Sequence, residues 1–350
     1  MFVLQKIPAL PFRAALGRVR RRPRPCLRRL AAILVAALSL TGAVSIYRTV
    51  AGPPGVGHFR SAEGRREYLE YYRQAMETMP APSQTQDVAT GFGTVRVYTW
   101  AGGGEQGAPP VVLLPGRTSG VPMWSANVPL LARSRRVIAL DALGDAGMSV
   151  QSAPLTSVED QAAWVDEVIS AVAPEGAHLV GHSFGGATAA VYARLHPDRV
   201  RSLTLLEPVF TFAYPPAGIM AWTMAASVPA LPESWRNRAL ERIGGDRLSG
   251  ADPMELMITA GAESFDASLP TPSPLTDEEA EALTMPVYLA IAGSGSVAGG
   301  SRAAERAQEV LPRASIQVWD GATHSLPMQE AEPLTPVLEQ FWAQADAGAS

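Results

Sequence analysis

The sequence predicts an α/β fold with a mostly parallel central sheet and helices on both of its faces. Two observations carry this prediction. Short apolar runs recur along the chain with helical stretches between them, as expected for strands buried on both faces. One such run leads directly into a Gly-x-Ser-x-Gly turn and a helix. Because strands and helices alternate, we expect ligands to bind at the carboxyl ends of the parallel strands.

The N-terminus combines a basic segment, residues 1–29, with an uncharged apolar run of 17 residues over 30–46. This pattern predicts a single-pass signal anchor that keeps the basic segment in the cytoplasm and places the remainder of the chain outside. The run is near the lower limit for a membrane-spanning helix. A cleaved signal with secretion of the enzyme, or a misassigned start of a cytoplasmic protein, is the alternative.

A connector over residues 47–86 precedes the core, and within it Tyr68 to Met79 is expected to be helical. The first part of the core covers residues 87–209. Its clearest helix is predicted over 157–172, with Thr156 and Glu159 as a capping box. Its expected strands are Thr94–Trp100, Val111–Leu114, Val137–Leu140, Leu179–Val180 and Leu203–Leu206.

The alternation of strands and helices stops between residues 210 and 285. This stretch is too long for an ordinary loop and contains helical pieces at Ser234–Ile243 and Met254–Ala260. We interpret it as a helical cap over the active site, whose Met and Trp side chains either line the substrate or pack the cap itself. Residues 286–350 form the second part of the core, with strands at Val287–Ile291 and Ile316–Val318.

Ser183, at the centre of Gly181-His182-Ser183-Phe184-Gly185-Gly186, is the predicted nucleophile. A serine hydroxyl needs exposure, a fixed position and a neighbouring base to attack a carbonyl. A sharp turn between strand and helix supplies the first two, and it requires small residues at Gly181 and Gly185. The N–H groups that begin the helix point to where an oxyanion would form.

His324 is the predicted base. It lies in a loop after the last expected strand, at the same sheet edge as Ser183, and Gly321 shortly precedes it. The other four histidines lie before the core, at the start of the nucleophile strand, at a helix end, or directly beside Ser183. Of these, His182 adjoins Ser183, but adjacent side chains at such a turn point in different directions.

In these motifs the chain resembles the α/β-hydrolase superfamily over about residues 85–345. The resemblance rests on the Ser183 motif, on Gly-Ala-Thr-His324, on the loop Asp141 to Ser149, and on Leu-Pro-Gly-Arg117. It implies an α/β-hydrolase fold with a cap after the sixth strand. It also implies a Ser–acid–His triad in that chain order and no metal or other cofactor.

The acid is where the sequence departs from this family. Asp or Glu usually follows the seventh strand, but here that strand leads into residues 293–300, which contain no carboxylate, and the usual position falls near Ser296. Some branches hold the acid at the end of the sixth strand, where this chain has Glu207. We therefore predict Glu207 as the acid. The alternatives are Asp320, or a structural role for Glu207 with a Ser–His dyad.

Two backbone N–H groups are expected to form the oxyanion hole. One belongs to Phe184, the residue after the nucleophile, and the other, by the resemblance, to Arg117. Pro115 stands where the family usually has histidine. The Arg117 side chain either forms a salt bridge or faces an anionic substrate, and Asp145 is expected to be structural.

These residues predict a serine hydrolase that cleaves a small carboxylic ester, with a hydrophobic substrate favoured, through an acyl-enzyme. An amidase, a thioesterase or a hydrolase of C–C bonds would use the same triad. A membrane-tethered binding protein without activity is a further alternative, because the usual acid is missing. The net charge of −4 argues against a nucleic-acid partner, whereas the predicted anchor makes the membrane a partner.

Overall fold

The computed structural model describes residues 55–104, 107–226, 231–245 and 249–348. The predicted basic segment and signal anchor, residues 1–29 and 30–46, lie outside these residues. Within the described ranges, none of the helices is both long and apolar enough to cross a membrane.

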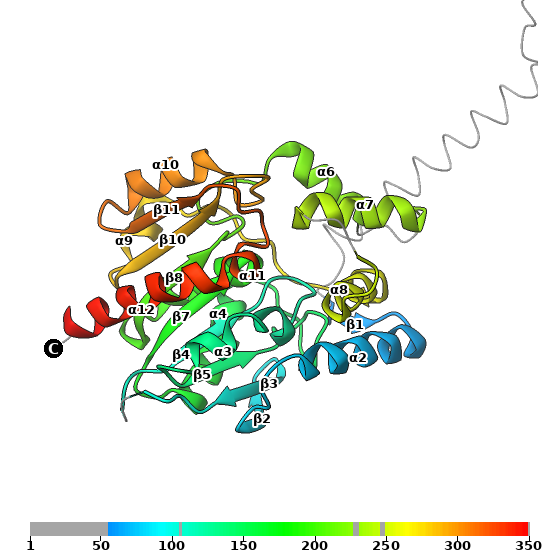
Figure 1. The fold of residues 1–350 in the computed structure, drawn as a ribbon, viewed down its shortest axis with the longest axis horizontal. Helices are drawn as coiled ribbons and strands as arrows, with labels where there is room; N and C mark the ends of the chain where they lie inside the picture. Colours follow the sequence, from blue (N-terminus) through cyan, green and yellow to red (C-terminus); the bar gives the residue numbers. More distant parts are fainter. Residues whose placement is uncertain (1–54, 105–106, 227–230, 246–248, 349–350) are drawn as a thin grey trace, which may run out of the picture. The chain divides into compact units, whose positions relative to one another are not determined.

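A nine-stranded sheet forms the centre of the described chain, in the order β11-β10-β8-β7-β4-β5-β3-β2 (Figure 1). The short strand β6 pairs with β3. The strands from β11 to β5 are parallel, and β3, β2 and β6 are antiparallel to their neighbours. This confirms the predicted α/β fold with a mostly parallel sheet. The strands are β2 (Gln84–Thr90), β3 (Gly93–Trp100), β4 (Val111–Leu114), β5 (Val137–Leu140), β6 (Val150–Gln151), β7 (Ala177–His182), β8 (Val200–Leu206), β10 (Val287–Ala292) and β11 (Ser315–Trp319).

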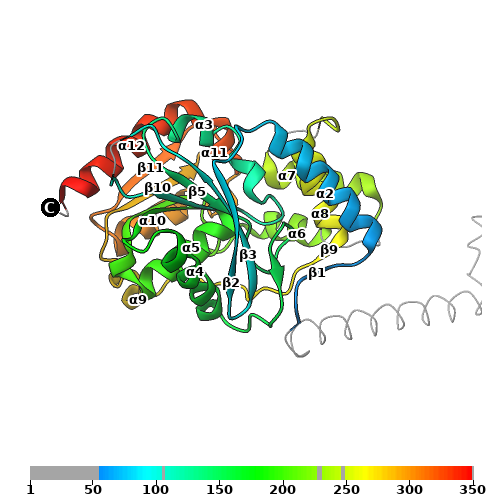
Figure 2. The ribbon, with the colours of Figure 1, turned by 90° about the horizontal axis from the view of Figure 1, so that it is seen from below.

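Helices cover both faces of this sheet, and alternate side chains of each strand enter the two layers. In β4, Val112 and Leu114 pack with the first layer, whereas Val111 and Leu113 pack with the second. Figure 2 shows α4 and α5 on one side of the sheet and α3 and α12 on the other. The first layer contains α4 (Val158–Val172), α5 (Ser183–Leu195), α9 (Asp277–Glu281) and α10 (Ser301–Val310); the second contains η1 (Val121–Trp124), α3 (Val128–Leu131), α11 (Leu326–Gln329) and α12 (Ala331–Gly348). A 3₁₀ turn, η2 (Pro197–Arg199), links α5 to β8.

Helix α4 corrects one detail of the sequence analysis. Its N-cap is Ser157, whose side chain accepts from the Asp160 N–H, and Asp160 completes the capping box. The predicted pair, Thr156 and Glu159, was therefore wrong by one residue. The reason is that Thr156 and Ser157 are both capable caps, and the Asp160 carboxylate accepts hydrogen bonds from both residues.

Between β8 and β10 the chain forms α6 (Ala217–Ala226), α7 (Glu233–Gly244), α8 (Pro253–Ser264) and the two-residue strand β9 (Phe265–Asp266) before α9. An earlier segment joins this insertion. Helix α2 (Ala62–Glu77) packs along α8, and β1 (His58–Phe59) pairs with β9 (Figure 2). The segment that the sequence suggested as a connector therefore contributes a helix and a strand to the packing of the insertion.

Candidate active site

Ser183 lies at the sharp turn between β7 and α5. Its φ angle is +53°, a left-handed conformation that is strained for a serine. The neighbouring glycines leave no room for a side chain. A Cβ on Gly181 would lie 2.5 Å from the Gly185 carbonyl oxygen, and one on Gly185 would lie 2.3 Å from the Pro115 carbonyl oxygen. The turn thus holds the Ser183 side chain at the carboxyl edge of the sheet.

His324 meets Ser183 from the loop that follows β11. Its Nε2 lies 2.9 Å from the Ser183 Oγ, and both side chains are largely buried. Helix α7 of the insertion reaches the same loop, because the Gly244 carbonyl accepts hydrogen bonds from the hydroxyls of Thr323 and Ser325. The insertion therefore contacts both chain neighbours of His324.

Glu207 follows β8 and lies on the other side of His324. Its Oε2 is 3.1 Å from the His324 Nδ1, and its side chain is fully buried. Its backbone has a φ of +49°, which is also left-handed. The structure thus brings together Ser183, His324 and Glu207, the three residues that the sequence singled out. Asp320, the alternative acid, is exposed and has no hydrogen bond to His324.

The segment after β10 surrounds the Glu207 carboxylate with donors. Oε1 accepts from the Ala292 N–H and the Ser296 hydroxyl, both at 2.8 Å. Oε2 accepts from the N–H groups of Val297 at 3.0 Å and Ala298 at 3.3 Å. Burial raises the pKa of the Glu207 carboxyl, but the hydrogen bonds from His324 and from these groups outweigh burial, so its pKa lies below the ordinary value. Glu207 is therefore ionised at neutral pH.

This arrangement fixes the proton on the His324 ring. An ionised carboxylate can only accept, so the His324 Nδ1 carries the hydrogen that Glu207 binds. The Nε2 lone pair then faces the Ser183 hydroxyl, which donates to it. Such a histidine can take the proton of Ser183, and the neighbouring carboxylate can stabilise the imidazolium that forms.

The loop at residues 115–118 lies directly against the nucleophile turn. A Cβ on Gly116 would be 3.2 Å from the Ser183 Cβ. The Phe184 N–H is among the first of α5 and has no acceptor within the helix. The Arg117 N–H likewise has no acceptor among the described residues. Neither predicted oxyanion donor is therefore engaged by another group in the described part of the chain.

The Arg117 side chain lies 5.7 Å above the Phe184 ring, and its Nε is 3.9 Å from the Asp145 carboxylate. Asp145 is buried and accepts the Thr118 N–H at 2.8 Å and the Ala146 N–H at 2.8 Å. Asp145 therefore joins the loop that carries the predicted oxyanion donor to the loop after β5. Of the two roles considered for the Arg117 side chain, the salt bridge is present, with a distance close to the upper limit for an ion pair.

A second buried carboxylate, Asp141, supports the same two loops. It accepts the Val121 N–H at 2.8 Å and the Met148 N–H at 2.7 Å. The Tyr72 hydroxyl of α2 donates to it at 2.9 Å. Burial raises the pKa of the Asp141 carboxyl above its ordinary value. Through Tyr72, helix α2 is anchored to the loops that border the site.

His182 is the residue whose contribution the sequence analysis missed. Its side chain makes no hydrogen bond to Ser183, as expected for adjacent residues at this turn. Instead its Nε2 lies 2.9 Å from the backbone carbonyl oxygen of His324. The only sequence signal was a histidine immediately before the nucleophile, which gives no indication of this contact.

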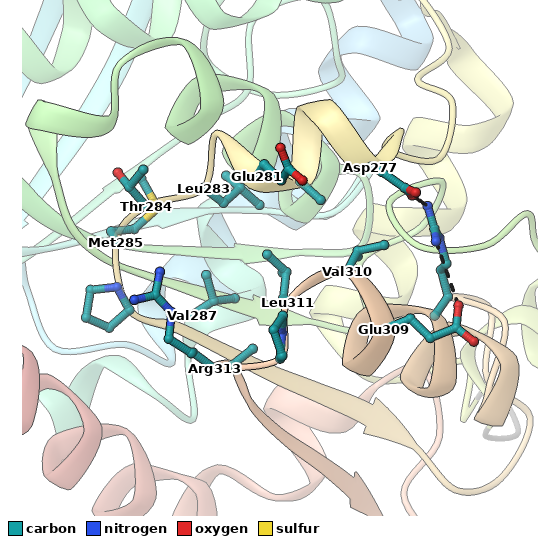
Figure 3. A pocket seen from close by; sticks show the side chains of 15 residues that line it. Asp277, Glu281, Leu283, Thr284, Met285, Val287, Glu309, Val310, Leu311 and Arg313 are labelled. Atoms are coloured by element: carbon teal, nitrogen blue, oxygen red, sulfur yellow. Dashed lines mark hydrogen bonds and ion pairs between the residues drawn. The ribbon is translucent and has the colours of Figure 1, made fainter.

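A hollow of about 810 Å³ lies at the amino ends of the parallel strands, across the sheet from the edge that carries Ser183. It is bordered by Val287, the first residue of β10, whereas Ala292 at the other end of that strand contacts Glu207. Figure 3 shows Asp277 and Glu309 on its rim, and both form ion pairs with Arg306. The hollow is therefore separate from Ser183. In the described ranges, His, Cys, Asp and Glu side chains form no cluster that could hold a metal ion.

Comparisons with known proteins agree with this architecture. A family model described as "alpha/beta hydrolase fold" matches residues 109–248. The 2-hydroxymuconate semialdehyde hydrolase of Pseudomonas sp. (strain CF600) is 30% identical over 260 residues, which cover 69% of this chain and 89% of that protein. The chain belongs to the α/β-hydrolase family.

Two further α/β hydrolases are similar over most of the chain. Carboxylesterase YbfK of Bacillus subtilis (strain 168) is 26% identical over 281 residues, which cover 78% of this chain and 93% of that protein. The crystal structure of naproxen esterase (carboxylesterase NP) from Bacillus subtilis superposes with a TM-score of 0.73 at 23% identity, covering 81% of this chain and 99% of that one. The likeness to this structure confirms the fold that the sequence predicted.

Proposed function

We propose that this enzyme is a serine carboxylesterase that works through an acyl-enzyme. One observation carries the proposal: a continuous pair of hydrogen bonds joins Ser183 Oγ to His324 Nε2 at 2.9 Å and His324 Nδ1 to Glu207 Oε2 at 3.1 Å. In this proposal Ser183 is the nucleophile, His324 the general base and Glu207 the acid that orients the base. The similarity to two proteins named as carboxylesterases supports an ester as the substrate.

Acylation begins when the Ser183 Oγ bonds to the ester carbonyl carbon and its proton passes to the His324 Nε2. The N–H groups of Phe184 and Arg117 stabilise the negative oxygen of the tetrahedral intermediate. When this intermediate collapses, the bond to the alkoxy group breaks and His324 returns the proton to the departing alcohol. A water molecule then attacks the acyl carbon while His324 takes its proton. The bond between the acyl carbon and Ser183 Oγ breaks, His324 returns the proton to Oγ, and the carboxylic acid is released.

A hydrophobic ester is the substrate class that the insertion favours. Helix α6 contains no charged residue and is mostly apolar, and Met224 on α6 and Trp235 on α7 are exposed. The α7 end of this insertion contacts the loop that carries His324. Apolar side chains stabilise apolar acyl or alcohol groups by removing them from water, and in this proposal those of the insertion do so for the bound ester.

Cleavage of a C–C bond is the second candidate, because two relatives at 30% identity are named as 2-hydroxymuconate semialdehyde hydrolases. The same triad would serve both reactions. Comparing kcat/KM for p-nitrophenyl esters with that for 2-hydroxymuconate semialdehyde separates them, since a carboxylesterase should turn over only the ester efficiently.

We also propose that residues 30–46 anchor the enzyme in a membrane with its catalytic part on the extracytoplasmic side. The basic segment before this apolar run supports that orientation. Fractionation of cells that express the full chain is the test. Recovery in the membrane fraction, released by detergent but not by salt, is expected, whereas a soluble chain that begins near residue 50 would indicate a cleaved signal.

Labelling with a fluorophosphonate probe tests the proposed chemistry. The probe should modify Ser183, identified by mass spectrometry of the labelled peptide, and the Ser183→Ala variant should be neither labelled nor active on p-nitrophenyl esters. Thr188→Ala is the matched control, since it removes another buried hydroxyl from α5 without touching His324. Failure of the folded wild-type enzyme to react would favour a binding protein instead.

A further inference from the structure

His182 ends strand β7, next to the nucleophile, and its imidazole lies inside the protein rather than in the substrate site. The side chain is 5% exposed. Its ring centre is 4.9 Å from that of His324, with an angle of 39° between the ring planes. The proposed mechanism gives this histidine no chemical step, so its burial beside the base needs another explanation.

The hydrogen bond at its Nε2 determines the state of the ring. A backbone carbonyl oxygen can only accept, so the His182 Nε2 carries a hydrogen and donates it to the His324 carbonyl at 2.9 Å. The Nδ1 atom is buried and has no hydrogen-bond partner among the described residues. Burial and the neighbouring His324 lower the pKa of His182 to about 3. The ring is therefore neutral, with one donor directed at the backbone of the base.

The opposite edge of the ring lies against the loop that carries the predicted oxyanion donor. A Cβ on Gly116 would be 2.9 Å from the His182 Nδ1, so the loop backbone and the ring are in close contact. A Cβ on Gly116 would also be 3.2 Å from the Ser183 Cβ. The imidazole thus occupies the space between residue 116 on one side and the backbone of His324 on the other.

We propose that His182 is a positioning residue, which sets the distance between the His324 loop and the 115–118 loop around Ser183. Its donated hydrogen bond fixes the backbone from which the base projects, and its ring volume keeps the oxyanion loop in place. Catalytic geometry is sensitive to such supports, because a displacement of about 1 Å costs roughly 10²-fold in rate. This inference rests on the proposed function, since the contacts it describes matter only if His324 is the base.

Two variants separate the donor from the ring. His182→Phe keeps an aromatic ring but removes the donor, whereas His182→Gln places an amide N–H near the position of Nε2. His178→Phe is the matched control, because His178 is a buried histidine near the other end of β7, bonded to Ser202 and Asp346 rather than to the site. Turnover of a p-nitrophenyl ester is measured per active site, with sites counted by burst titration, so that loss of folded protein is not mistaken for loss of rate.

The expected result is that kcat per active site falls at least ten-fold in His182→Phe with KM within about three-fold, and that His182→Gln restores most of the loss. The control should keep wild-type kcat per site even where it lowers the melting temperature. A loss below ten-fold, or a Gln variant no better than Phe, overturns the proposal. If His182→Phe does not fold, His182→Asn replaces it, because its shorter amide does not reach the His324 carbonyl.

A second measurement does not depend on turnover. The proton between the His324 Nδ1 and Glu207 is expected to give a low-field ¹H signal in the wild-type protein. This signal should shift or broaden in His182→Phe, return in His182→Gln and remain unchanged in His178→Phe. If the wild-type enzyme hydrolyses no ester, the proposed function fails. If the low-field signal is the same in all variants, the positioning role fails instead.

Discussion

Replacing Glu207 with glutamine is the perturbation whose effect follows most directly from the geometry. The substitution keeps the shape of the side chain but removes its charge and turns one oxygen into an NH₂ group. Each Glu207 oxygen accepts from protein donors, two at Oε1 and three at Oε2 counting His324. The new NH₂ group must therefore face donors in either orientation.

If the amide nitrogen faces His324, the Nδ1 atom must accept, and the ring proton moves to the Nε2 that should receive the Ser183 proton. In serine proteases the corresponding loss of the correct tautomer lowers kcat by about 10⁴-fold. If the nitrogen faces the Ala292 N–H instead, two donors oppose each other, at a cost of about 1–3 kcal/mol in folding stability. His324 then keeps its tautomer, but its imidazolium faces an uncharged acceptor.

We therefore expect kcat to fall by about 10² to 10⁴-fold in Glu207→Gln, with binding of substrate little changed. Initial rates of p-nitrophenyl ester hydrolysis and the rate of fluorophosphonate labelling both measure this, and circular dichroism checks the fold. Ser296→Ala is the matched control: it removes one donor from Glu207 Oε1 but keeps the charge, and should lower kcat by less than about ten-fold. A folded Glu207→Gln enzyme within ten-fold of wild type would refute Glu207 as the acid.

Three further predictions concern stability and the loops around the site. Burial holds the pKa of His182 at about 3 and that of His178 at about 4, below the ordinary 6.5; both are neutral in the fold, so unfolding takes up protons below pH 6.5. Stability should be complete above that pH and fall toward pH 4 by up to about 1.4 kcal/mol per pH unit for each histidine. Urea unfolding at pH 5 and pH 7.5 measures the fall, which His178→Phe should reduce; an equal fall in that variant would contradict the assignment. Asp145→Asn leaves one amide oxygen to serve both the Thr118 and Ala146 N–H groups, so kcat should drop about ten-fold with KM nearly constant; unchanged kcat would show that the loop needs no such support. Gly185→Ala places a Cβ 2.3 Å from a carbonyl oxygen and should abolish activity or folding, whereas an active, stable variant would show that the turn can open.

The arrangement of the sheet could be predicted because its signals are local. Four-residue apolar runs such as Val111–Leu114 and Val137–Leu140 coincide with β4 and β5. Helix boundaries were less accurate. The helix expected over Tyr68–Met79 begins at Ala62, since Ser61 caps it, and the piece expected over Met254–Ala260 extends to Ser264. Periodicity indicates that a helix exists, but caps and neighbouring elements decide where it begins and ends.

The contacts of the site could be predicted only where chain order limits the possibilities. Ser183, Glu207 and His324 each follow a strand, so their approach at one sheet edge follows from the parallel topology. The contact of His182 with the His324 carbonyl has no such signal, because it joins a side chain to a backbone atom 142 residues away. The packing of α2 along α8 was missed for the same reason. The amphipathic pattern of each helix shows that one face is buried, but not which helix covers it.

The position of the acid has a physical explanation in the register of the sheet. Strands β8 and β10 are parallel neighbours, with Leu206 opposite Ala290, and the Glu207 N–H donates to the Ala290 carbonyl at 2.8 Å. A carboxylate at the end of β8 therefore lies beside the segment that follows β10, within reach of the same histidine. That segment has no acidic residue of its own, and instead its N–H groups and the Ser296 hydroxyl converge on Glu207. A second carboxylate there would repel Glu207 and raise the pKa of one of the two groups. The absence of an acid after β10 and the presence of Glu207 after β8 are thus two parts of one electrostatic arrangement. The N–H and hydroxyl dipoles after β10 stabilise the single buried carboxylate, which accepts a hydrogen bond from His324.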